Sequence, residues 1–370
     1  MNASFSPARF LDFSGLDTLI QAIRSAGYRC MGPAIENDAL VLRELTGARE
    51  LPRGMQAEQA PGQFKLTHDA ENRYFAWANG PQAIKPYVFA PRESLWQVRR
   101  DEKGSLKFES FTPQPEKTAL IGVRACDLAA LTLQDAHFLE GQYSDSSYAI
   151  RRKSLFMVAM QCAEPAATCF CASTGDGPTP QSGYDLSLAE LPDGFVVAAG
   201  SEPGQKVLSM LDLNEATPEQ IQSTKEQGEA AARRQTRSLP ARDLRPLLMN
   251  NLEHARWDEV AARCLACGNC TAVCPTCFCH AALDEPDAAA GKSLHVRQWD
   301  SCFNEGHAYL HGHNVRPDTR TRYRQWLTHK LATWHEQYGR SGCVGCGRCI
   351  TWCPAGIDLT EEVAAMAKGS

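Results

Sequence analysis

The sequence has no apolar run long enough to cross a lipid bilayer. Its longest apolar stretches, residues 155–160 and 195–199, have the length of single strands, whereas a transmembrane helix needs about 20 such residues. The N-terminus lacks a basic segment followed by an apolar one, so it does not have the form of a secretory signal. The net charge of −5 gives no basic excess for nucleic acid. We therefore expect a cytoplasmic protein with no membrane span and no nucleic-acid partner.

Motifs for nucleotide binding and hydrolysis are missing too. No G-x-G-x-x-G segment opens a helix after a strand, and the chain has no Walker loop and no H-E-x-x-H pair. We therefore predict no catalytic residue in this chain. Its 370 residues, 43% of them hydrophobic and 22% charged, are typical of a soluble chain with room for two domains.

Residues 1–205 are expected to form an α/β (α+β) domain. Apolar runs of strand length stand at 39–42, 119–123, 155–160 and 195–198, and segments with helical spacing lie between them. The first helix is expected to start at Ser14 to Asp17, which has the form of a capping box, and to end by Gly27. Residues 46–118 are rich in proline, glycine and polar residues and give no clear pattern.

Residues 206–255 predict a helical connector. Thr217 to Gln220 (TPEQ) has the residues of a helix start, with proline at the first helical position and a capping glutamine. The polar stretch up to Arg237 is typical of an exposed helix. A second helix is expected over 242–263, leading into residues 256–370, which are expected to form a helical, bacterial ferredoxin-like dicluster domain.

Cysteine is abundant and unevenly distributed. Of the 16 cysteines, Cys30 alone lies in the first 125 residues, whereas six fall between Cys264 and Cys279. Because the cytosol keeps thiols reduced, this density indicates metal binding rather than disulfides. Cys30 is expected to be a small core residue.

Two runs, 264–275 and 343–354, have the pattern C-x2-C-x2-C-x3-C-P of bacterial ferredoxins. In two-cluster proteins the first three cysteines of such a run bind one 4Fe–4S cluster and the fourth binds the other. The predicted ligand sets are therefore Cys264, Cys267, Cys270 and Cys353 for one cluster, and Cys343, Cys346, Cys349 and Cys274 for the other. This crossed assignment requires the two runs to meet in space, although residues 276–342 separate them in sequence.

A pair of zinc sites is the alternative for these runs, because Cys-x2-Cys occurs in both chemistries. Zinc needs only four ligands per ion and gives no reason for a third cysteine followed by x3-Cys-Pro. Gly268, Gly345 and Gly347 also fit iron–sulfur binding, since the backbone must pass close to the inorganic core. The pattern favours two 4Fe–4S clusters, either as a relay or as structural groups.

Four cysteines nearer the N-terminus form another group: Cys126, Cys162, Cys169 and Cys171. Cys126 follows the strand predicted to end at Val123, and Cys162 follows the one predicted to end at Met160. In an open α/β sheet both would lie at the carboxyl edge, where ligands commonly bind. These residues predict a tentative third cluster, with a redox thiol pair or incidental buried cysteines as alternatives. Cys277, Cys279 and Cys302 are expected to pack near the clusters, with tuning of cluster hydrogen bonds or a role as an alternative ligand as the other interpretations.

A basic stretch between the two runs contains Arg316, Arg320, Arg322, Arg324 and Lys330. It predicts either a docking surface for an acidic partner or a charged helix face whose arginines pair with nearby carboxylates.

Several stretches carry a family resemblance: ARCLACGNCTAVCPTCFC, GCVGCGRCITWCP, GVRACDLAALTLQDAHFL and RRKSLFMVAMQCAEPAATCFC. Over about residues 115–360 the chain resembles the beta subunit of cytosolic NiFe sulfhydrogenases and the related iron–sulfur subunit of anaerobic sulfite reductases. The resemblance implies an electron-transfer subunit of a multisubunit redox complex.

Such a subunit relays single electrons between a flavin- and NAD(P)-binding, diaphorase-like subunit and a catalytic metalloenzyme subunit. A NiFe hydrogenase is the preferred catalytic partner, and an anaerobic sulfite reductase is the alternative. A rival of another class is an enzyme that reduces a sulfur compound at the N-terminal cysteines.

Overall fold

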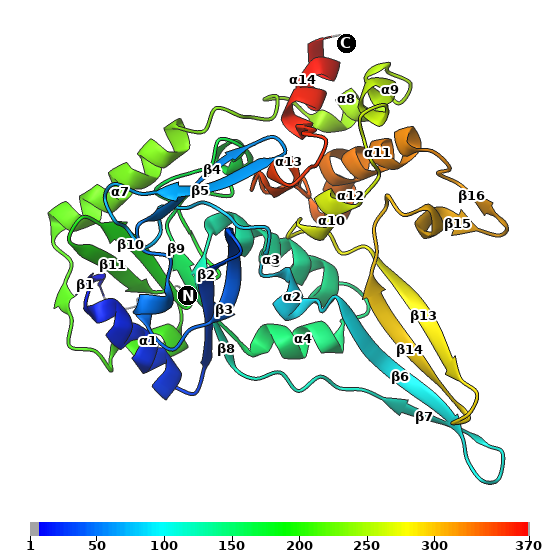
Figure 1. Ribbon diagram of the computed structural model, residues 1–370, viewed down its shortest axis with the longest axis horizontal. Coiled ribbons are helices and arrows are strands. Elements are labelled where there is room, and N and C mark those ends of the chain that lie inside the picture. The colour runs from blue at the N-terminus through cyan, green and yellow to red at the C-terminus, as the bar shows by residue number, and fades with distance from the viewer. Residues whose placement is uncertain (1–6, 369–370) are drawn as a thin grey trace.

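The computed structural model describes residues 7–368. A large sheet covered by helices on both faces lies at one end, a helical part lies at the other, and a long four-stranded arm projects beside them (Figure 1). Within the described residues, no helix combines the length and the apolar character needed to span a membrane.

The large sheet has eight strands in the order β12-β1-β11-β10-β9-β8-β2-β3. Its four central strands run parallel: β2 (Arg29–Glu36), β8 (Thr118–Val123), β9 (Leu155–Met160) and β10 (Leu186–Leu191). The outer strands pair antiparallel: β3 (Ala39–Glu44), β11 (Gly194–Ala199), β1 (Arg9–Asp12) and β12 (Asn214–Glu215). The mixed α/β architecture expected for this part of the chain is therefore confirmed.

Helices cover both faces of this sheet. α1 (Gly15–Ser25) and α6 (Glu202–Leu208) pack on one face, and α3 (Ala125–Leu139), α4 (Ser146–Lys153) and the short α2 (Lys85–Val88) pack on the other. In β9, Phe156 and Val158 enter the first core while Met157 and Ala159 enter the second. A continuous apolar run is what a strand buried on both faces requires.

The capping box expected at Ser14 is not formed. The Ser14 side chain makes no cap hydrogen bond, and instead the Asp12 carboxylate accepts from Ser14 Oγ and from the Gly15 backbone N–H, both at 2.7 Å. Asp12 therefore caps α1 in place of Ser14, because its carboxylate accepts from the Gly15 N–H, one of the first-turn donors that have no partner within a helix.

The capping box expected at Thr217 is present at the start of α7 (Pro218–Arg233). α7 runs along β10 and β11 at the side of the sheet (Figure 1). The single helix expected over 242–263 is wrong. Two short helices, α8 (Leu244–Met249) and α9 (Arg256–Ala261), replace it. Between them the Asn251 carbonyl accepts from Trp257 Nε1 at 2.8 Å, which turns the chain so that the indole is fully buried.

The cysteine-rich part is built from short elements around an aromatic core. They are α10 (Asn269–Ala272), α11 (Thr319–Thr328), a π-helical turn (His329–Thr333), α12 (Trp334–Tyr338), α13 (Arg348–Thr351) and α14 (Leu359–Lys368), with small strands β15 (Tyr309–Leu310) and β16 (His313–Asn314) after a 3-10 turn (Glu305–Ala308). Trp257, Tyr323, Trp326 and Leu331 fill the space between them.

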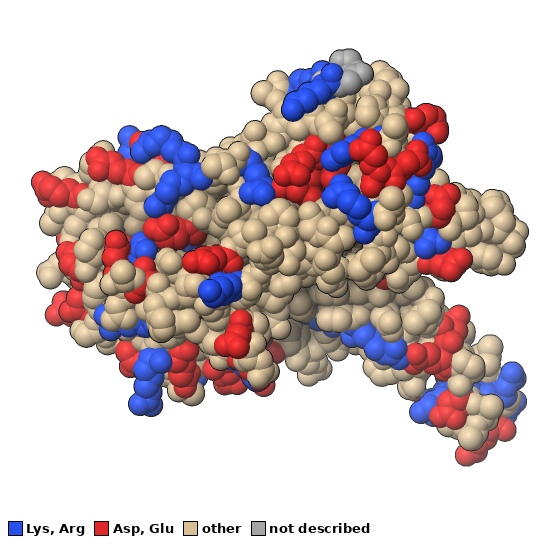
Figure 2. All heavy atoms as spheres, turned by 45° about the horizontal axis from the view of Figure 1, so that its top comes forward, with Lys and Arg blue, Asp and Glu red and all other residues tan. Residues whose placement is uncertain are grey.

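The arm joins segments that are remote in sequence. β13 (His280–Asp287), β14 (Lys292–Trp299), β6 (Arg92–Arg100) and β7 (Leu106–Ser110) form one antiparallel sheet. Acidic and basic side chains are mixed over the visible face of the molecule and at the tip of the arm (Figure 2).

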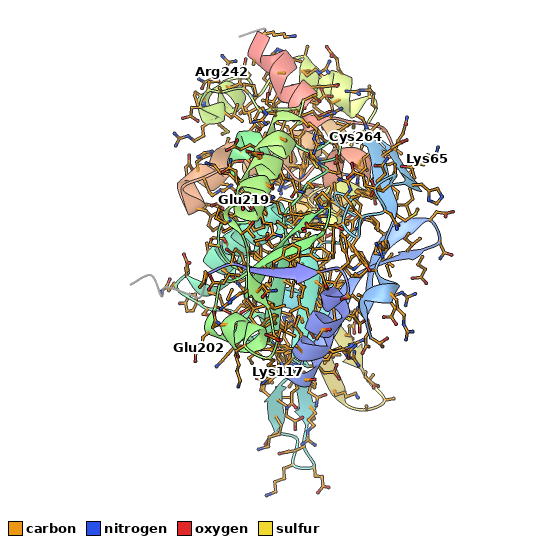
Figure 3. The ribbon with its side chains drawn as sticks, turned by 90° about the vertical axis from the view of Figure 1, so that its left-hand side faces the viewer. Lys65, Lys117, Glu202, Glu219, Arg242 and Cys264 are labelled. Carbon is orange, nitrogen blue, oxygen red and sulfur yellow. The ribbon has the colours of Figure 1, made fainter. Side chains whose placement is uncertain are left out.

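The remaining elements of residues 46–118 lie near the cysteine-rich part. After a short 3-10 turn (Ala48–Glu50), β4 (Met55–Ala60) and β5 (Gln63–His68) form a hairpin, and its Gly62 N–H donates to the Ile350 carbonyl at 3.1 Å. In Figure 3 Lys117, just before β8, lies well below Cys264, at the edge of the sheet that faces away from it.

Candidate metal centre

The two ferredoxin-type runs fold alike and lie side by side. In each, a glycine with positive φ starts a one-turn helix: Gly268 (φ +76°) precedes α10, and Gly347 (φ +75°) precedes α13. A Cβ at Gly347 would stand 2.6 Å from the Thr168 carbonyl oxygen, so only glycine fits there. α10 and α13 are in contact, so the runs meet despite the 276–342 segment between them.

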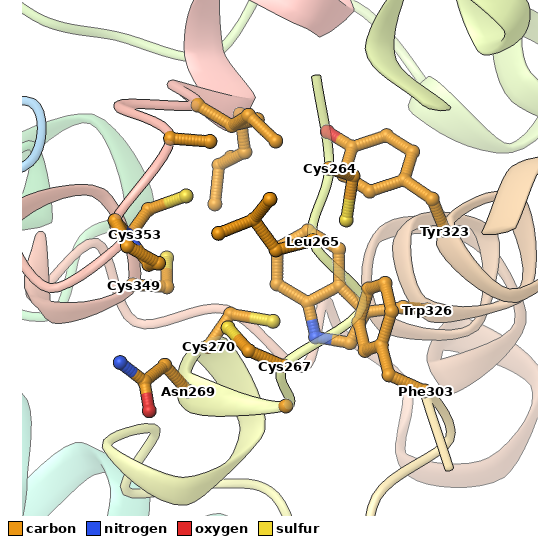
Figure 4. Close-up of a pocket in the computed structure, with 15 residues that line it drawn as sticks. Cys264, Leu265, Cys267, Asn269, Cys270, Phe303, Tyr323, Trp326, Cys349 and Cys353 are labelled. Carbon is orange, nitrogen blue, oxygen red and sulfur yellow. The ribbon is translucent and has the colours of Figure 1, made fainter. Parts of the chain in front are cut away.

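One group of thiols lines a cavity of about 470 Å³ (Figure 4). Five cysteines line it: Cys264, Cys267 and Cys270 of the first run, and Cys349 and Cys353 of the second. Burial raises the pKa of the Cys270 thiol, and its neighbours Cys264 and Cys353 raise it further. Phe303, Tyr323 and Trp326 form an apolar wall. Four of these five cysteines, all but Cys349, are the set that the crossed assignment predicts for one cluster.

A second group lies deeper and contains Cys274, Cys343, Cys346 and Cys349. Burial raises the pKa of Cys349, and Cys343, Cys346 and Cys274 raise it further in that order. Burial likewise raises the pKa of Cys343 to about 12. Cys274 differs from these two: its contact with Cys277, and then the Lys330 ammonium, lower the pKa of its thiol against the effect of burial. A cation or a metal cluster relieves the repulsion between buried thiolates in such a pocket.

Lys330 places a cation in this second group. Its Nζ donates to Cys274 Sγ at 3.3 Å, to Thr276 Oγ1 at 2.9 Å and to the Gly342 carbonyl at 3.3 Å, and the residue is only 5% exposed. Burial opposes its charge, but the thiolates of Cys274, Cys277 and Cys343 raise the pKa of Lys330 well above its usual value.

The basic stretch is therefore not one surface. Lys330 and Arg322 are buried, and the Arg322 guanidinium donates to backbone carbonyls. Arg320 and Arg324 pair with Glu253 at 2.8 and 2.9 Å, as expected for a charged helix face. Sequence reasoning missed Lys330 because its position next to Cys274 depends on a turn of π-helix.

The N-terminal cysteines converge at the carboxyl edge of the sheet. Cys126 lies in the first turn of α3 after β8, Cys162 follows β9, and Cys169 and Cys171 lie in the next loop, which includes α5 (Cys171–Thr174). All four are buried. Burial raises the pKa of Cys169, and the nearby thiols of Cys162, Cys171 and Cys346 raise it further. The sequence-predicted grouping is thus brought together, with Cys346 of the second group beside it.

Two amides reach these thiols. Gln235 Nε2 lies 3.2 Å from Cys171 Sγ, and Asn79 Nδ2 lies 3.8 Å from Cys126 Sγ while donating to the Cys346 carbonyl at 3.2 Å. Amide donors stabilise thiolates, as they do around iron–sulfur groups. Neither residue is signalled by the sequence, because each lies in a loop far from the cysteine it contacts.

A buried ion pair holds the sheet domain against the cysteine-rich part. The Arg348 guanidinium meets both carboxylate oxygens of Asp127, at 2.7 and 3.0 Å, and also donates to Asn79 Oδ1 at 3.0 Å. Arg348 is 2% exposed and Asp127 is 4% exposed. Thr168 and Thr351 add a hydrogen bond of 2.7 Å across the same junction. The relative placement of the second and third thiol groups therefore depends on this junction.

The remaining cysteines occupy two settings. Cys30 is a fully buried residue of the sheet core, as expected. Cys277 and Cys279 line a separate cavity beside the first ferredoxin-type run, and Cys302 is a buried residue of the aromatic core.

The donor sets fit iron–sulfur clusters chemically, because each proposed group offers four cysteine sulfurs and cubanes are held by four thiolates. No three histidine, cysteine or carboxylate side chains among residues 7–368 converge as they would around a single metal ion.

Comparison with known proteins agrees with this chemistry. Residues 263–357 match a family described as a 4Fe-4S dicluster domain, which defines an iron–sulfur protein with two clusters in its C-terminal part. Over 288 residues the chain is 32% identical to sulfhydrogenase 2 subunit beta of Pyrococcus furiosus. The matched region covers 77% of this chain and 83% of that subunit. The chain belongs to the sulfhydrogenase beta-subunit family. No solved structure matches it significantly.

Proposed function

We propose that this chain is the iron–sulfur electron-transfer subunit of a cytoplasmic multisubunit redox complex. It relays single electrons between a flavin- and NAD(P)-binding, diaphorase-like subunit and a catalytic metalloenzyme subunit, for which a NiFe hydrogenase is the preferred candidate. An anaerobic sulfite reductase is the alternative partner. The observation that supports this role most directly is the succession of three four-cysteine groups. Cysteines of the middle group lie beside both of the others.

The order of the groups follows from two cysteines. Cys349 is assigned to the second group but also lines the cavity of the first, close to Cys270. Cys346 is assigned to the second group but neighbours Cys126, Cys169 and Cys171 of the third. The second group therefore lies between the other two, which is the geometry that a relay requires and a purely structural role does not.

Each 4Fe–4S cluster, when bound, supplies a one-electron couple. The chain's own residues would hold it through the assigned thiolates, and burial of the second and third groups would exclude water. The paired helices α10 and α13 support the bacterial ferredoxin-like description of this domain. The crossed ligand assignment and the third cluster are parts of the proposal.

The first group is the one nearest to a partner. Cys267 is exposed and the neighbouring Leu265 side chain is 68% exposed, whereas the third group is buried throughout. Electrons would therefore enter or leave at the Cys264–Cys270 loop. Burial of Cys126, Cys162, Cys169 and Cys171 at 4–8% exposure also argues against the rival enzyme, because a sulfur substrate could not reach them directly.

Iron content tests the proposal. The chain purified without oxygen should hold about twelve irons, four for each cubane, and Cys171→Ser should reduce this to about eight. Cys30→Ser, which alters a core thiol outside all three groups, is the matched control and should keep the full content. A content of about eight in the unaltered chain removes the third cluster, and an iron-free chain overturns the proposed function altogether.

A further inference from the structure

Two buried polar atoms of the aromatic core, the Tyr323 hydroxyl and the Trp326 indole nitrogen, are left without a hydrogen bond. Within residues 7–368 neither atom has a hydrogen-bond partner. Tyr323 is only 2% exposed and Trp326 is 5% exposed, so bulk water does not satisfy them. Tyrosine and tryptophan usually bond through these atoms when buried, and orphaned buried donors are rare. The two side chains therefore point to an acceptor that the polypeptide itself does not supply.

Both side chains line the cavity of the first thiol group, with Cys264, Cys267 and Cys270. They stand three residues apart on α11, which puts them on the same face of the helix. In Figure 4 the Trp326 nitrogen lies on the side of the ring toward Cys267, and the Tyr323 ring lies toward Cys264. Two orphaned donors thus belong to the cavity that the first cluster would occupy.

Aromatic packing holds the two rings in place. The Tyr323 ring centroid lies 6.1 Å from that of Trp257, 6.4 Å from that of Phe303 and 5.6 Å from that of Trp326. The Phe303 and Trp326 centroids are 6.1 Å apart. Because these rings support one another in a close-packed core, neither polar atom can turn to another partner without disturbing it. The two donors are therefore fixed at the cavity before any group binds there.

Both atoms act as donors at neutral pH. The indole nitrogen of tryptophan can only donate a hydrogen bond. Burial raises the pKa of the Tyr323 hydroxyl well above its ordinary value, and the charges of Glu362 and then Cys270 raise it further, so the hydroxyl keeps its proton. Cluster and thiolate sulfurs accept such hydrogen bonds, and they are the acceptors that this cavity would bring to the two donors.

We propose that the Tyr323 hydroxyl and the Trp326 N–H donate hydrogen bonds to sulfur atoms of the first iron–sulfur cluster and raise its midpoint potential. The proposal rests on the proposed function, because it needs a cluster in this cavity. Reduction adds a negative charge to the cluster, so donors stabilise the reduced state more than the oxidised state. Since the first group is the one nearest to a partner, these two residues would set the potential at which electrons pass between the partner and the relay.

Redox titration of the cluster-loaded full chain, followed by electron paramagnetic resonance, tests the proposal. The first cluster is the one whose signal is lost in Cys267→Ser. Tyr323→Phe and Trp326→Phe should each keep the iron and reduce the equilibrium constant for reduction of this cluster about tenfold, which lowers its potential by about 60 mV for one electron. The proposal is overturned for either residue whose variant leaves this potential in place.

Two matched controls separate hydrogen bonding from packing. Tyr148→Phe removes a buried hydroxyl that already donates to Asp135 at 2.6 Å, and Trp257→Phe alters the same aromatic core at an indole that already donates to the Asn251 carbonyl at 2.8 Å. Both should leave the potential of the first cluster unchanged. An equal shift in Trp257→Phe and Trp326→Phe would show that core packing sets the potential, and would overturn the assignment of Trp326.

Electron–nuclear double resonance on the reduced, unaltered chain gives a measurement that needs no folded variant. Transfer into D2O should remove proton couplings to the first cluster, and Tyr323→Phe should already lack one of them. A spectrum without an exchangeable proton beyond those of backbone N–H groups, identical in the unaltered chain and Tyr323→Phe, overturns the hydroxyl donor. An iron-free chain would instead overturn the relay, so failure of one proposal is distinguishable from failure of the other.

Discussion

Lys330 Nζ lies 3.3 Å from Cys274 Sγ, so a buried ammonium contacts a thiol assigned to the central cluster. A cation and hydrogen-bond donor at a ligand sulfur stabilises the reduced, more negative state. Lys330→Met should therefore lower the midpoint potential of one cluster by on the order of 60 mV, taking about 1.5 kcal/mol for a hydrogen bond to a charged group. A redox titration followed by electron paramagnetic resonance measures the shift.

Arg324→Gln is the matched control for that titration. Arg324 precedes the same π-helical turn but pairs with Glu253 at the surface, so its removal should leave every potential in place. An unchanged set of potentials in Lys330→Met would contradict the assignment of Cys274 to a cluster.

The crossed ligand assignment can be checked by combining substitutions. Cys267 and Cys353 line one cavity, so Cys267→Ser, Cys353→Ser and the double variant should all lose the same cluster, about four irons. Cys267→Ser combined with Cys274→Ser should lose about eight. If Cys353 belongs with its own run instead, the Cys267/Cys353 double variant loses about eight irons and the other pair loses about four.

The Asp127–Arg348 pair should dominate the stability of the junction. Asp127→Asn leaves the Arg348 guanidinium buried with its bidentate partner neutralised, and we expect a loss of about 3 kcal/mol in the free energy of unfolding. Anaerobic denaturant titration measures it. Glu109→Gln, which breaks an exposed pair with Arg99 in the arm, should have a much smaller effect on the free energy of unfolding, because solvent and salt screen exposed charges. Equal effects of the two variants would show that the buried pair has no special role.

His137 should make stability depend on pH. Burial first, and then the charge of His280, lower the pKa of His137 to about 4. The folded state holds a neutral ring, so this stability is fully present above the unfolded pKa of about 6.5 and is lost as the pH falls toward 4. At pH 5 the loss is about 1 kcal/mol after allowance for solvent screening of this half-buried ring.

Thermal unfolding of the loaded chain at pH 7 and pH 5 tests this. His137→Leu should show a smaller decrease in melting temperature between the two pH values than the unaltered chain. His311→Asn, at an exposed position with positive φ that asparagine tolerates, should show the same decrease as the unaltered chain. A His137→Leu variant with an undiminished decrease would contradict the assignment.

The fold was predictable where a local pattern determines it. The apolar run at 155–160 became the buried strand β9, and the capping residues at Thr217 and Gln220 start α7. The capping box predicted at Ser14 was wrong, because Asp12, which lies outside the four-residue motif, accepts from the first N–H of α1 instead. Residues 46–118 gave no pattern because β6 is defined by its pairing with β14, which no local signal reports.

The candidate site was also predictable only in part. Spacing alone grouped Cys264, Cys267 and Cys270, and strand ends predicted where Cys126 and Cys162 would meet. The contact of Lys330 with Cys274 was unpredictable, because it depends on how remote segments close around the cysteines.

The arm also has a consequence for synthesis and cluster loading. Arg297 of β14 donates to Glu93 of β6 across 204 residues of sequence, and the second thiol group needs Cys274 together with the run at 343–349. A chain growing from its N-terminus can complete neither until almost all of it has left the ribosome, and such long-range closure is slow. Iron delivery to the first and central groups should therefore come late in synthesis, after Cys353 has emerged, and their cysteines need protection from oxidation until then.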